Sequence, residues 1–257
     1  MPEAYRNPRD SYTFYSGGVP AGVKWLLIIN LGVFVVTYLA TASGYGSFFN
    51  DFSLWPRAVI SIPALWQLVT YLFLHDPRGF GHILFNMLAL WMIGSELERG
   101  WGTRLFLKFY FICGIGAGIC VVVANLLFGN IDARTIGSSG AIYGLLLAYG
   151  VLYPDRIILF SFLFPIKAKY FVMILGAIAF LGSIGASGGA VSHVAHLGGM
   201  LIGLVYLLVY IKRPRTAVGF RRSFEDWRRA WQRRRAKKKF EVYMRRQGSD
   251  RTDRWTN

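Results

Sequence analysis

Apolar residues gather in long stretches of the sequence, separated by segments rich in charged, polar or turn-forming residues. A helix needs about 20 mostly apolar residues to cross the hydrocarbon core of a bilayer. The stretches predict spans at about 21–40, 80–94, 105–128, 139–152, 170–184 and 191–210. We therefore expect an all-α polytopic membrane protein with six transmembrane helices.

The composition agrees with a chain that lies mostly in lipid. Of its 257 residues, 54% are apolar and only 16% are charged, whereas a typical soluble domain has about 25% charged residues. This balance argues against a cytosolic enzyme, a coiled coil or a disordered regulator. The presence of only two cysteines argues against a secreted disulfide scaffold.

The basic residues predict how the spans are oriented. Those on one side are Arg6, Arg9, Lys24, Arg99, Arg104, Arg156, Lys167 and Lys169, and those on the other are Arg57, Arg78 and Arg134. The positive-inside rule then places both termini in the cytoplasm. We expect a cytoplasmic segment at 1–20, a membrane domain at 21–211 and a cytoplasmic tail at 212–257. Residues 40–42 resemble a signal-peptidase site, so cleavage of the first span is an alternative, but the long charged lead-in favours a retained span.

The predicted tail is strongly basic. Residues 212–257 contain 17 of the 29 Lys and Arg residues and 5 of the 13 acidic residues, so they carry most of the net charge of +16. Phe220, Phe224, Trp227 and Trp231 recur at helical spacing among arginines, which is typical of an amphipathic helix on an anionic leaflet. A solvated tail that only fixes orientation is the alternative. Behind a membrane domain we expect a lipid partner and no nucleic acid.

Polar groups inside predicted spans are costly in lipid and are therefore candidates for function. His82 and Asn86 lie four residues apart, which places them on one face of the second span. A hydrogen bond between packed helices is the structural alternative.

The fourth span begins at Ser139, within the sequence Gly-Ser-Ser-Gly at 137–140. Its 14 residues rise only about 21 Å, so the helix should begin below the membrane surface. A serine at a buried helix start lies among free N–H groups, which could form an oxyanion hole. A plain helix cap is the alternative interpretation.

His196 lies in the sixth span and is followed by Gly199 and Gly203. The fourth span has the same small-residue spacing at Gly140 and Gly144. Small residues allow two helices to approach closely, and such a contact would bring Ser139 beside a base that could activate it.

These residues resemble motifs of the rhomboid intramembrane serine proteases. The resemblance rests on Gly-x-Ser-Gly at 137–140 with Tyr143, on His82-x-x-x-Asn86, and on Ala-His at 195–196 with the glycines that follow. Further similarity lies in Trp-Gln-Leu-Val-Thr at 66–70 and Glu-x-Glu at 96–98, so that the resemblance covers about 25–210.

The resemblance implies a six-transmembrane-helix rhomboid-like bundle that cleaves transmembrane segments of single-span membrane proteins with a Ser-His dyad. Ser139 would be the nucleophile and His196 the general base, and Asn86 and His82 with the Ser139 N–H would stabilise the oxyanion. Tyr143 would pack on the His196 ring.

The same resemblance implies supporting roles for Gly137, Gly140 and Gly199. Residues 43–79 would form a lateral loop, and the fifth helix with 182–189 a gate and cap. Gln67 departs from the arginine that many members carry after the Trp, which bears on loop packing. We expect no cofactor or metal and a bacterial plasma membrane location.

Other membrane functions fit less well. A metalloprotease needs His-Glu-x-x-His, an aspartyl protease needs two aspartates within its spans, and a transporter would show paired repeats or a charged path. None of these patterns occurs in the predicted spans. An inactive rhomboid-like protein that binds membrane clients remains the alternative, although such relatives usually lose the serine or the histidine.

Overall fold

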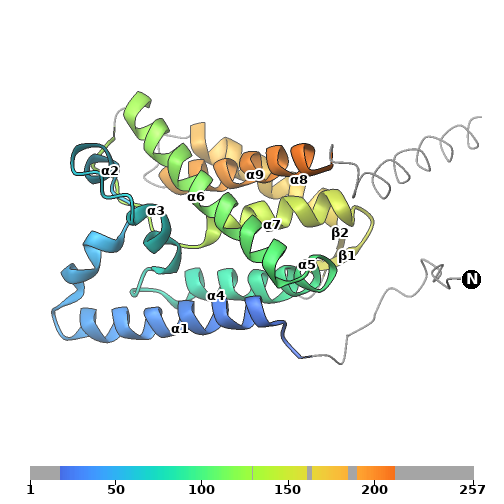
Figure 1. Cartoon of the computed structure of the whole chain (residues 1–257), viewed down its shortest axis with the longest axis horizontal. Coiled ribbons are helices and arrows are strands. Elements are labelled where there is room, and N and C mark those ends of the chain that lie inside the picture. The colour runs from blue at the N-terminus through green and yellow to red at the C-terminus, as the bar shows by residue number, and fades with distance from the viewer. Residues whose placement is uncertain (1–17, 129, 161–163, 185–189, 212–257) are drawn as a thin grey trace, which may run out of the picture. The chain divides into compact units, whose positions relative to one another are not determined.

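The computed structural model describes residues 18–128, 130–160, 164–184 and 190–211. Within these ranges the chain is mainly helical (Figure 1), and its compact unit ends at Leu207. The helices are α1 (Ala21–Ala42), η1 (Gly46–Phe52), α2 (Pro56–Ser61), α3 (Gln67–Thr70), η2 (Tyr71–Phe73), α4 (Phe80–Ala89), η3 (Leu90–Gly94), α5 (Ser95–Trp101), α6 (Thr103–Phe128), α7 (Ser139–Leu152), α8 (Ala168–Ile184) and α9 (Ala190–Ile211). The strands are β1 (Ile157–Phe160) and β2 (Phe164–Lys167).

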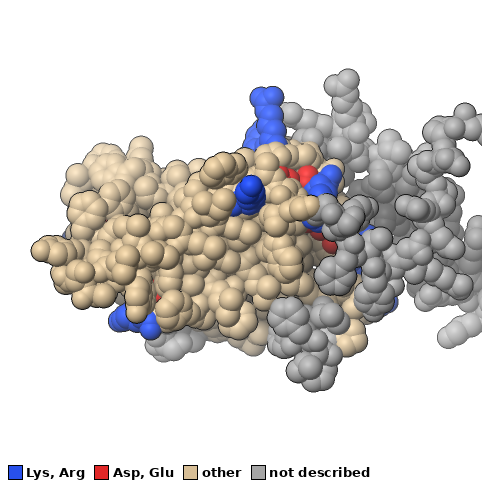
Figure 2. Space-filling model, turned by 90° about the horizontal axis from the view of Figure 1, so that it is seen from below, with Lys and Arg blue, Asp and Glu red and all other residues tan. Residues whose placement is uncertain are grey.

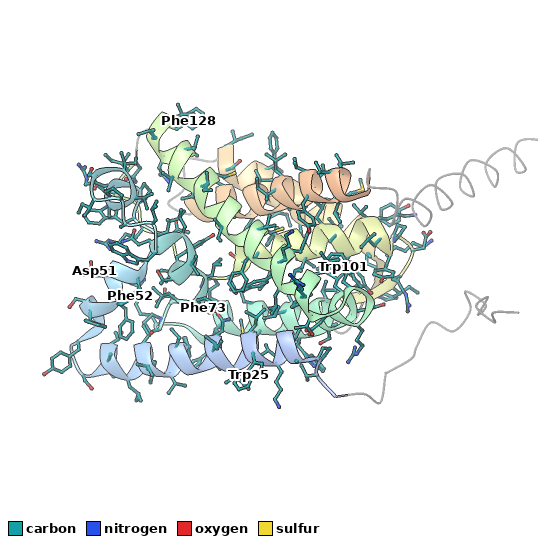
Figure 3. All side chains as sticks on the ribbon, viewed as in Figure 1. Trp25, Asp51, Phe52, Phe73, Trp101 and Phe128 are labelled. Atoms are coloured by element: carbon teal, nitrogen blue, oxygen red, sulfur yellow. The ribbon has the colours of Figure 1, made fainter. Side chains whose placement is uncertain are left out.

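Three helical stretches are long and apolar enough to cross a membrane: Ala21–Ala42, Phe80–Trp101 and Thr103–Phe128. Three further apolar helices are shorter over the part described, at Ser139–Leu152, Ala168–Ile184 and His193–Val209. Their outward surfaces are apolar, and one face of the molecule shows few charged side chains (Figure 2). Trp25 and Phe128 are 61% and 88% exposed (Figure 3), as expected for side chains that meet lipid rather than water.

The helix boundaries differ from the sequence prediction mainly in the second span. It continues past Gly94 to Trp101, because the chain passes through the single π-helical turn η3 without breaking the helix. A Cβ on Gly94 would lie 3.2 Å from the Val23 side chain and 3.3 Å from that of Phe106, so this turn packs closely on α1 and α6. The predicted bounds of α7 agree with the structure.

The strands β1 and β2 were not predicted. They form a short antiparallel hairpin, with Ile158 opposite Ile166, between α7 and α8. The predicted cytoplasmic segment at 1–20, the basic tail with its amphipathic helix and most of the cap at 182–189 lie largely or wholly outside the described residues.

Helix α7 is surrounded by other helices of the compact unit. It contacts α4 and η3 on one side and α6 and α8 on others. Figure 1 shows α1 and α4 on one side of α7, with α8 and α9 on the other. The N-terminus of α7 is therefore held inside the bundle: Ser138, its capping residue, is fully buried.

The segment 43–79, predicted to be a lateral loop, contains the short helices η1, α2, α3 and η2, which were not predicted. Gln67 is 2% exposed and organises this segment. Its side-chain oxygen accepts a hydrogen bond from the Trp55 N–H at 2.9 Å, and its side-chain nitrogen donates to the Asp51 carbonyl at 3.1 Å. Gln67 thus acts in loop packing, at the end of the molecule where Figure 3 labels Asp51 and Phe52.

This lateral segment also holds the loop that leads into α7. Leu54 and Thr135 exchange two backbone hydrogen bonds of 2.9 Å. Arg57 makes a bidentate ion pair with Asp132 at 2.6 and 2.7 Å, and the Arg134 guanidinium lies 4.3 Å from the centroid of the Trp55 ring. These contacts hold the loop that precedes Ser139 in place against the lateral segment.

Helix α1 is held in the bundle by a buried carboxylate. Glu98 is 2% exposed and accepts hydrogen bonds from the backbone N–H groups of Gly22 and Val23 at 2.8 and 2.7 Å. Its carboxylate also accepts a bond of 2.6 Å from the Thr103 hydroxyl. The first N–H groups of a helix lack partners within the helix, so Glu98 satisfies the start of α1 and ties it to α5 and α6.

Replacing Glu98 by Ala should therefore loosen α1. The buried N–H groups of Gly22 and Val23 would lose their acceptor, which should lower the free energy of unfolding by about 2–3 kcal/mol. In detergent the Tm should fall by roughly 5–10 °C. Asp155→Asn, which removes an exposed ion pair with Lys169, should change stability by less than about 1 kcal/mol. Equal Tm values for the two variants would show that Glu98 does not anchor α1.

Candidate active site

Helices α7 and α9 approach each other closely where glycines face one another. A Cβ on Gly199 would collide with the carbonyl oxygen of Gly140, and a Cβ on Gly203 would lie 3.3 Å from the Gly144 Cα. A Cβ on Gly140 would itself lie 3.2 Å from the Ala195 carbonyl oxygen. The two backbones are therefore in direct contact at the level of the first turn of α7.

This contact brings Ser139 and His196 together. The Ser139 hydroxyl lies 2.9 Å from Nε2 of His196, so it can donate a hydrogen bond to the ring. The Tyr143 ring stacks on the His196 ring, with centroids 4.0 Å apart and planes inclined by only 2°. Nδ1 of His196 has no hydrogen-bond partner among the described residues, which leaves Tyr143 as the contact that fixes the plane of the ring.

His82 and Asn86 lie beside Gly137, two residues before Ser139. A Cβ on Gly137 would lie 2.9 Å from the His82 ring and 4.0 Å from Nδ2 of Asn86. Gly137 also has φ +116°, a conformation that side-chain-bearing residues rarely adopt. Glycine is thus required at 137 by both the backbone conformation and the close His82 ring.

Asn86 presents a hydrogen-bond donor without a partner. Its side chain is 7% exposed, and Nδ2 makes no hydrogen bond within the described part of the chain. Buried polar groups are nearly always paired, so such a donor calls for an explanation. A developing negative charge near Ser139 would supply the missing acceptor. Ser139 and His196 are only half-buried and His82 is exposed, so the group is not sealed from outside.

The structure also brings in His75 and His193, for which the sequence predicted no role. Nε2 of His75 lies 3.4 Å from the Ser138 hydroxyl. The His193 ring lies 6.0 Å from the His196 ring and against Gly182 of α8. His193 lies in the predicted sixth span, so the cost of a polar group in lipid could have indicated it. His75 lies before the second span, outside the predicted spans, so that argument does not apply to it.

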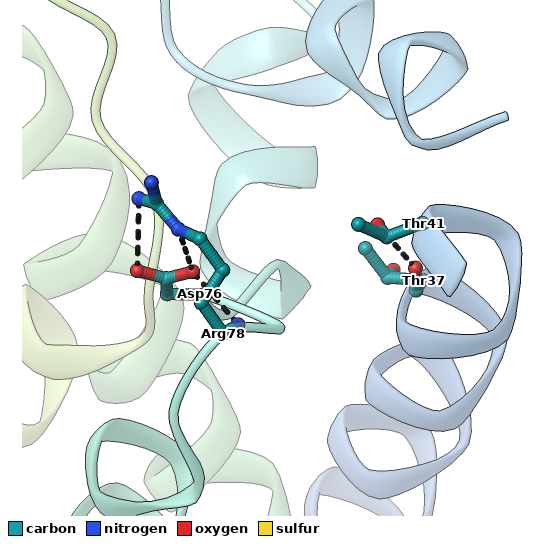
Figure 4. Close-up of polar contacts among 4 residues, drawn as sticks. All are labelled: Thr37, Thr41, Asp76 and Arg78. Carbon is teal, nitrogen blue, oxygen red and sulfur yellow. Dashed lines mark hydrogen bonds and ion pairs between the residues drawn. The ribbon is translucent and has the colours of Figure 1, made fainter. Parts of the chain in front are cut away.

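The turn that leads from His75 into α4 is closed by an ion pair. The Arg78 side chain donates to the Asp76 carboxylate at 3.0 and 3.1 Å, and the Arg78 backbone N–H donates to it at 3.0 Å (Figure 4). The guanidinium holds the pKa of Asp76 below its usual value. This turn fixes where α4 begins, and therefore the height of His82 beside Gly137.

Comparison with known proteins identifies the family. A model of the rhomboid domain matches residues 63–213, which is more than half of the chain. The chain belongs to the rhomboid family. The match includes Ser139, His196, Tyr143, His82 and Asn86.

Several curated rhomboid proteins are similar in sequence. Rhomboid protein 1, mitochondrial, of Saccharomyces cerevisiae is 32% identical over 131 residues, covering 50% of this chain and 38% of the yeast protein. Rhomboid protease GluP of Bacillus subtilis is 30% identical over 204 residues, which cover 77% of this chain and 34% of GluP. Rhomboid protease AarA of Providencia stuartii is 30% identical over 163 residues, which cover 58% of this chain and 57% of AarA.

The aligned region spans between about a third and two thirds of the first relatives' own lengths. Membership of the rhomboid family, together with the long apolar helices, makes the chain an integral membrane protein. The relatives include mitochondrial, chloroplast and bacterial proteins, so the family alone does not fix the membrane.

Gly199→Ala should destabilise this rhomboid-family protein, because the new methyl group would collide with the Gly140 carbonyl. Overpacking of this kind costs about 1–3 kcal/mol and should lower the Tm in detergent. Gly32 in α1 is a matched control, since a Cβ there would meet nothing within 4 Å. Gly32→Ala should leave the Tm unchanged or raise it, because Ala in a helix interior is more stable than Gly by up to about 1 kcal/mol. Equal behaviour of the two variants would contradict a close contact between α7 and α9.

Proposed function

We propose that this rhomboid-family protein is an intramembrane serine endopeptidase in which Ser139 is the nucleophile and His196 the general base. The observation that carries the proposal is the 2.9 Å contact between the Ser139 hydroxyl and Nε2 of His196. A serine hydroxyl is a weak nucleophile until an adjacent base removes its proton. The protease names of relatives such as GluP support the same activity.

The geometry supports the following reaction. As the Ser139 oxygen attacks the carbonyl carbon of the scissile peptide bond, its proton moves to Nε2 of His196. The carbonyl oxygen becomes an oxyanion, and the tetrahedral intermediate collapses when His196 returns the proton to the leaving amine. Water then releases the acyl group from Ser139 by the same steps, with His196 again acting as base and acid.

Two contacts prepare the pair for this chemistry. A dyad has no carboxylate to orient the base, and the stacked Tyr143 ring restricts the His196 plane instead. Nδ2 of Asn86, which has no partner in the described part of the chain, would donate to the oxyanion together with His82 and the Ser139 backbone N–H. A preorganised site stabilises such a charge strongly. Gly137, Gly140 and Gly199 support the site by allowing the turn and the helix contact.

The membrane arrangement completes the proposal. Six helices within 21–211 would span the bilayer, with the segments 1–20 and 212–257 in the cytoplasm of a bacterial plasma membrane. The substrates would be single-span membrane proteins, cleaved within or beside their transmembrane segments. The basic tail would bind anionic lipid. The alternation of basic residues along the sequence supports this orientation.

Ser139→Ala and His196→Ala should each abolish cleavage of a model transmembrane substrate in proteoliposomes. The first removes the nucleophile and the second removes the base. Both positions are only half-buried, so the variants should remain folded. Ser138→Ala should stay active, with a loss far smaller than that of Ser139→Ala, because the Ser138 hydroxyl contacts His75, whereas it is the Ser139 hydroxyl that contacts His196.

Cleavage products separated by electrophoresis give the readout, and the Tm of each variant reports folding. Normal turnover by Ser139→Ala would refute the protease proposal. Binding of membrane clients without turnover, in wild type and variant alike, would favour the inactive client-binding alternative.

Asn86→Ala should lower kcat by about 10²- to 10³-fold, the usual effect of removing one oxyanion donor. KM should change little, because the donor acts on charge that develops only in the transition state. Steady-state kinetics in proteoliposomes test this. If Asn86→Ala instead lowers the Tm sharply and leaves kcat per folded molecule unchanged, Asn86 is a packing residue.

A further inference from the structure

Behind Ser139 lies a group of buried polar side chains that the proposed mechanism does not use. They come from four parts of the chain: His75 from the lateral segment, Ser138 from the cap of α7, Tyr110 from α6 and Asn30 from α1. Each is at most 1% exposed. Polar groups in such surroundings are costly unless they interact with one another.

These side chains are neighbours. The Ser138 hydroxyl lies 3.4 Å from Nε2 of His75. The Tyr110 hydroxyl lies near Ser138 and Asn30, although it makes no hydrogen bond within the described part of the chain. Nδ2 of Asn30 donates to the Leu26 carbonyl at 2.8 Å, which fixes the amide on α1. The group therefore runs from the lateral segment, past the residue next to Ser139, to two further helices.

His75 lies next to both sides of the candidate site. Through Ser138 it contacts the turn that carries Ser139. On the other side its ring lies beside the His82 ring, with centroids 5.2 Å apart. The same turn is held by a backbone hydrogen bond of 2.8 Å from the Gly137 N–H to the Tyr71 carbonyl. His75 thus sits where the nucleophile turn and the proposed oxyanion donors meet.

The charge state of His75 suits a role in positioning. Burial, and to a lesser extent the neighbouring His82, lowers the pKa of His75 to about 4. The ring is therefore neutral at pH 7 and has one N–H donor and one nitrogen acceptor. A neutral ring adds no charge to the site, so its contribution is to hold its neighbours in place.

We propose that His75 and Ser138 are positioning residues whose contact fixes the turn at 137–139 against His82. This inference rests on the proposed protease function. The contact keeps the Ser139 hydroxyl and the donors of His82 and Asn86 at a constant separation while the tetrahedral intermediate forms. Tyr110 of α6 and Asn30 of α1 lie behind this contact, and we assign them no part in it.

The test is a double-mutant cycle on the full-length protein in proteoliposomes, with a model transmembrane substrate. Ser138→Ala removes the hydroxyl, and His75→Phe keeps a ring beside His82 but removes the nitrogens. Each should lower kcat by about 3- to 10-fold, the factor that one neutral hydrogen bond is worth, while KM changes by less than about two-fold. The double variant should lose no more than either single variant, because both remove the same contact.

Two further variants separate positioning from stability. His75→Gln restores a hydrogen-bonding group near the position of Nε2 and should recover part of kcat. Thr37→Val in α1 is the matched control: Thr37 is 5% exposed, and its hydroxyl donates to the Val33 carbonyl at 2.7 Å (Figure 4 shows this residue). Thr37→Val, like Ser138→Ala, removes one hydrogen bond of a buried hydroxyl. It should therefore lower the Tm while leaving kcat unchanged.

Three results would overturn the inference. The first is unchanged kcat in both single variants, and the second is losses of kcat that multiply in the double variant. The third is a loss of kcat in Thr37→Val as large as that in Ser138→Ala, because kcat would then follow stability alone. Failure of the protease proposal is distinguishable, because wild type would then cleave no better than Ser139→Ala.

Discussion

The direct contact between the backbones of α7 and α9 is the constraint on which the candidate site depends. Gly140 and Gly199 touch without any side chain between them, and only at this separation can the Ser139 hydroxyl reach Nε2 of His196 at 2.9 Å. Association of helices in lipid depends on close packing, because apolar side chains gain little by leaving apolar lipid. The proposed chemistry and the stability of the bundle therefore rest on the same glycines.

The surroundings of α7 hold its N-terminus inside the protein. The loop before Ser139 is bound to the lateral segment by the Leu54–Thr135 backbone pair and by the Arg57–Asp132 ion pair. Irregular backbone within a membrane is tolerated only where protein or a watery cavity surrounds it. The lateral segment supplies those partners for the loop before α7, whose capping residue Ser138 is buried. Positioning by His75 belongs to the same arrangement, since it too reaches the turn from the lateral segment.

Much of this arrangement was predictable from local patterns. Apolar runs predicted the helices, and the spacing of Gly140 with Gly144 and of Gly199 with Gly203 predicted the contact that brings Ser139 to His196. Features that depend on long-range partners were not predictable in this way. Glu98 satisfies the N–H of Gly22 from 76 residues away, and nothing in either segment alone indicates that pairing. His75 lies outside the spans, and the β1–β2 hairpin is too short to give a clear alternating pattern.

Reaction of Ser139 with a fluorophosphonate probe in proteoliposomes tests the central claim most directly, because it reports the activated hydroxyl without any assumption about substrates. Mass spectrometry of wild-type protein should find the adduct on Ser139. His196→Ala should lose the labelling, and Gly199→Ala should slow it, whereas Gly32→Ala should react as wild type does. Equal labelling of Ser139 in wild type and His196→Ala would contradict the account, because the serine would then need no base brought to it by the contact between α7 and α9.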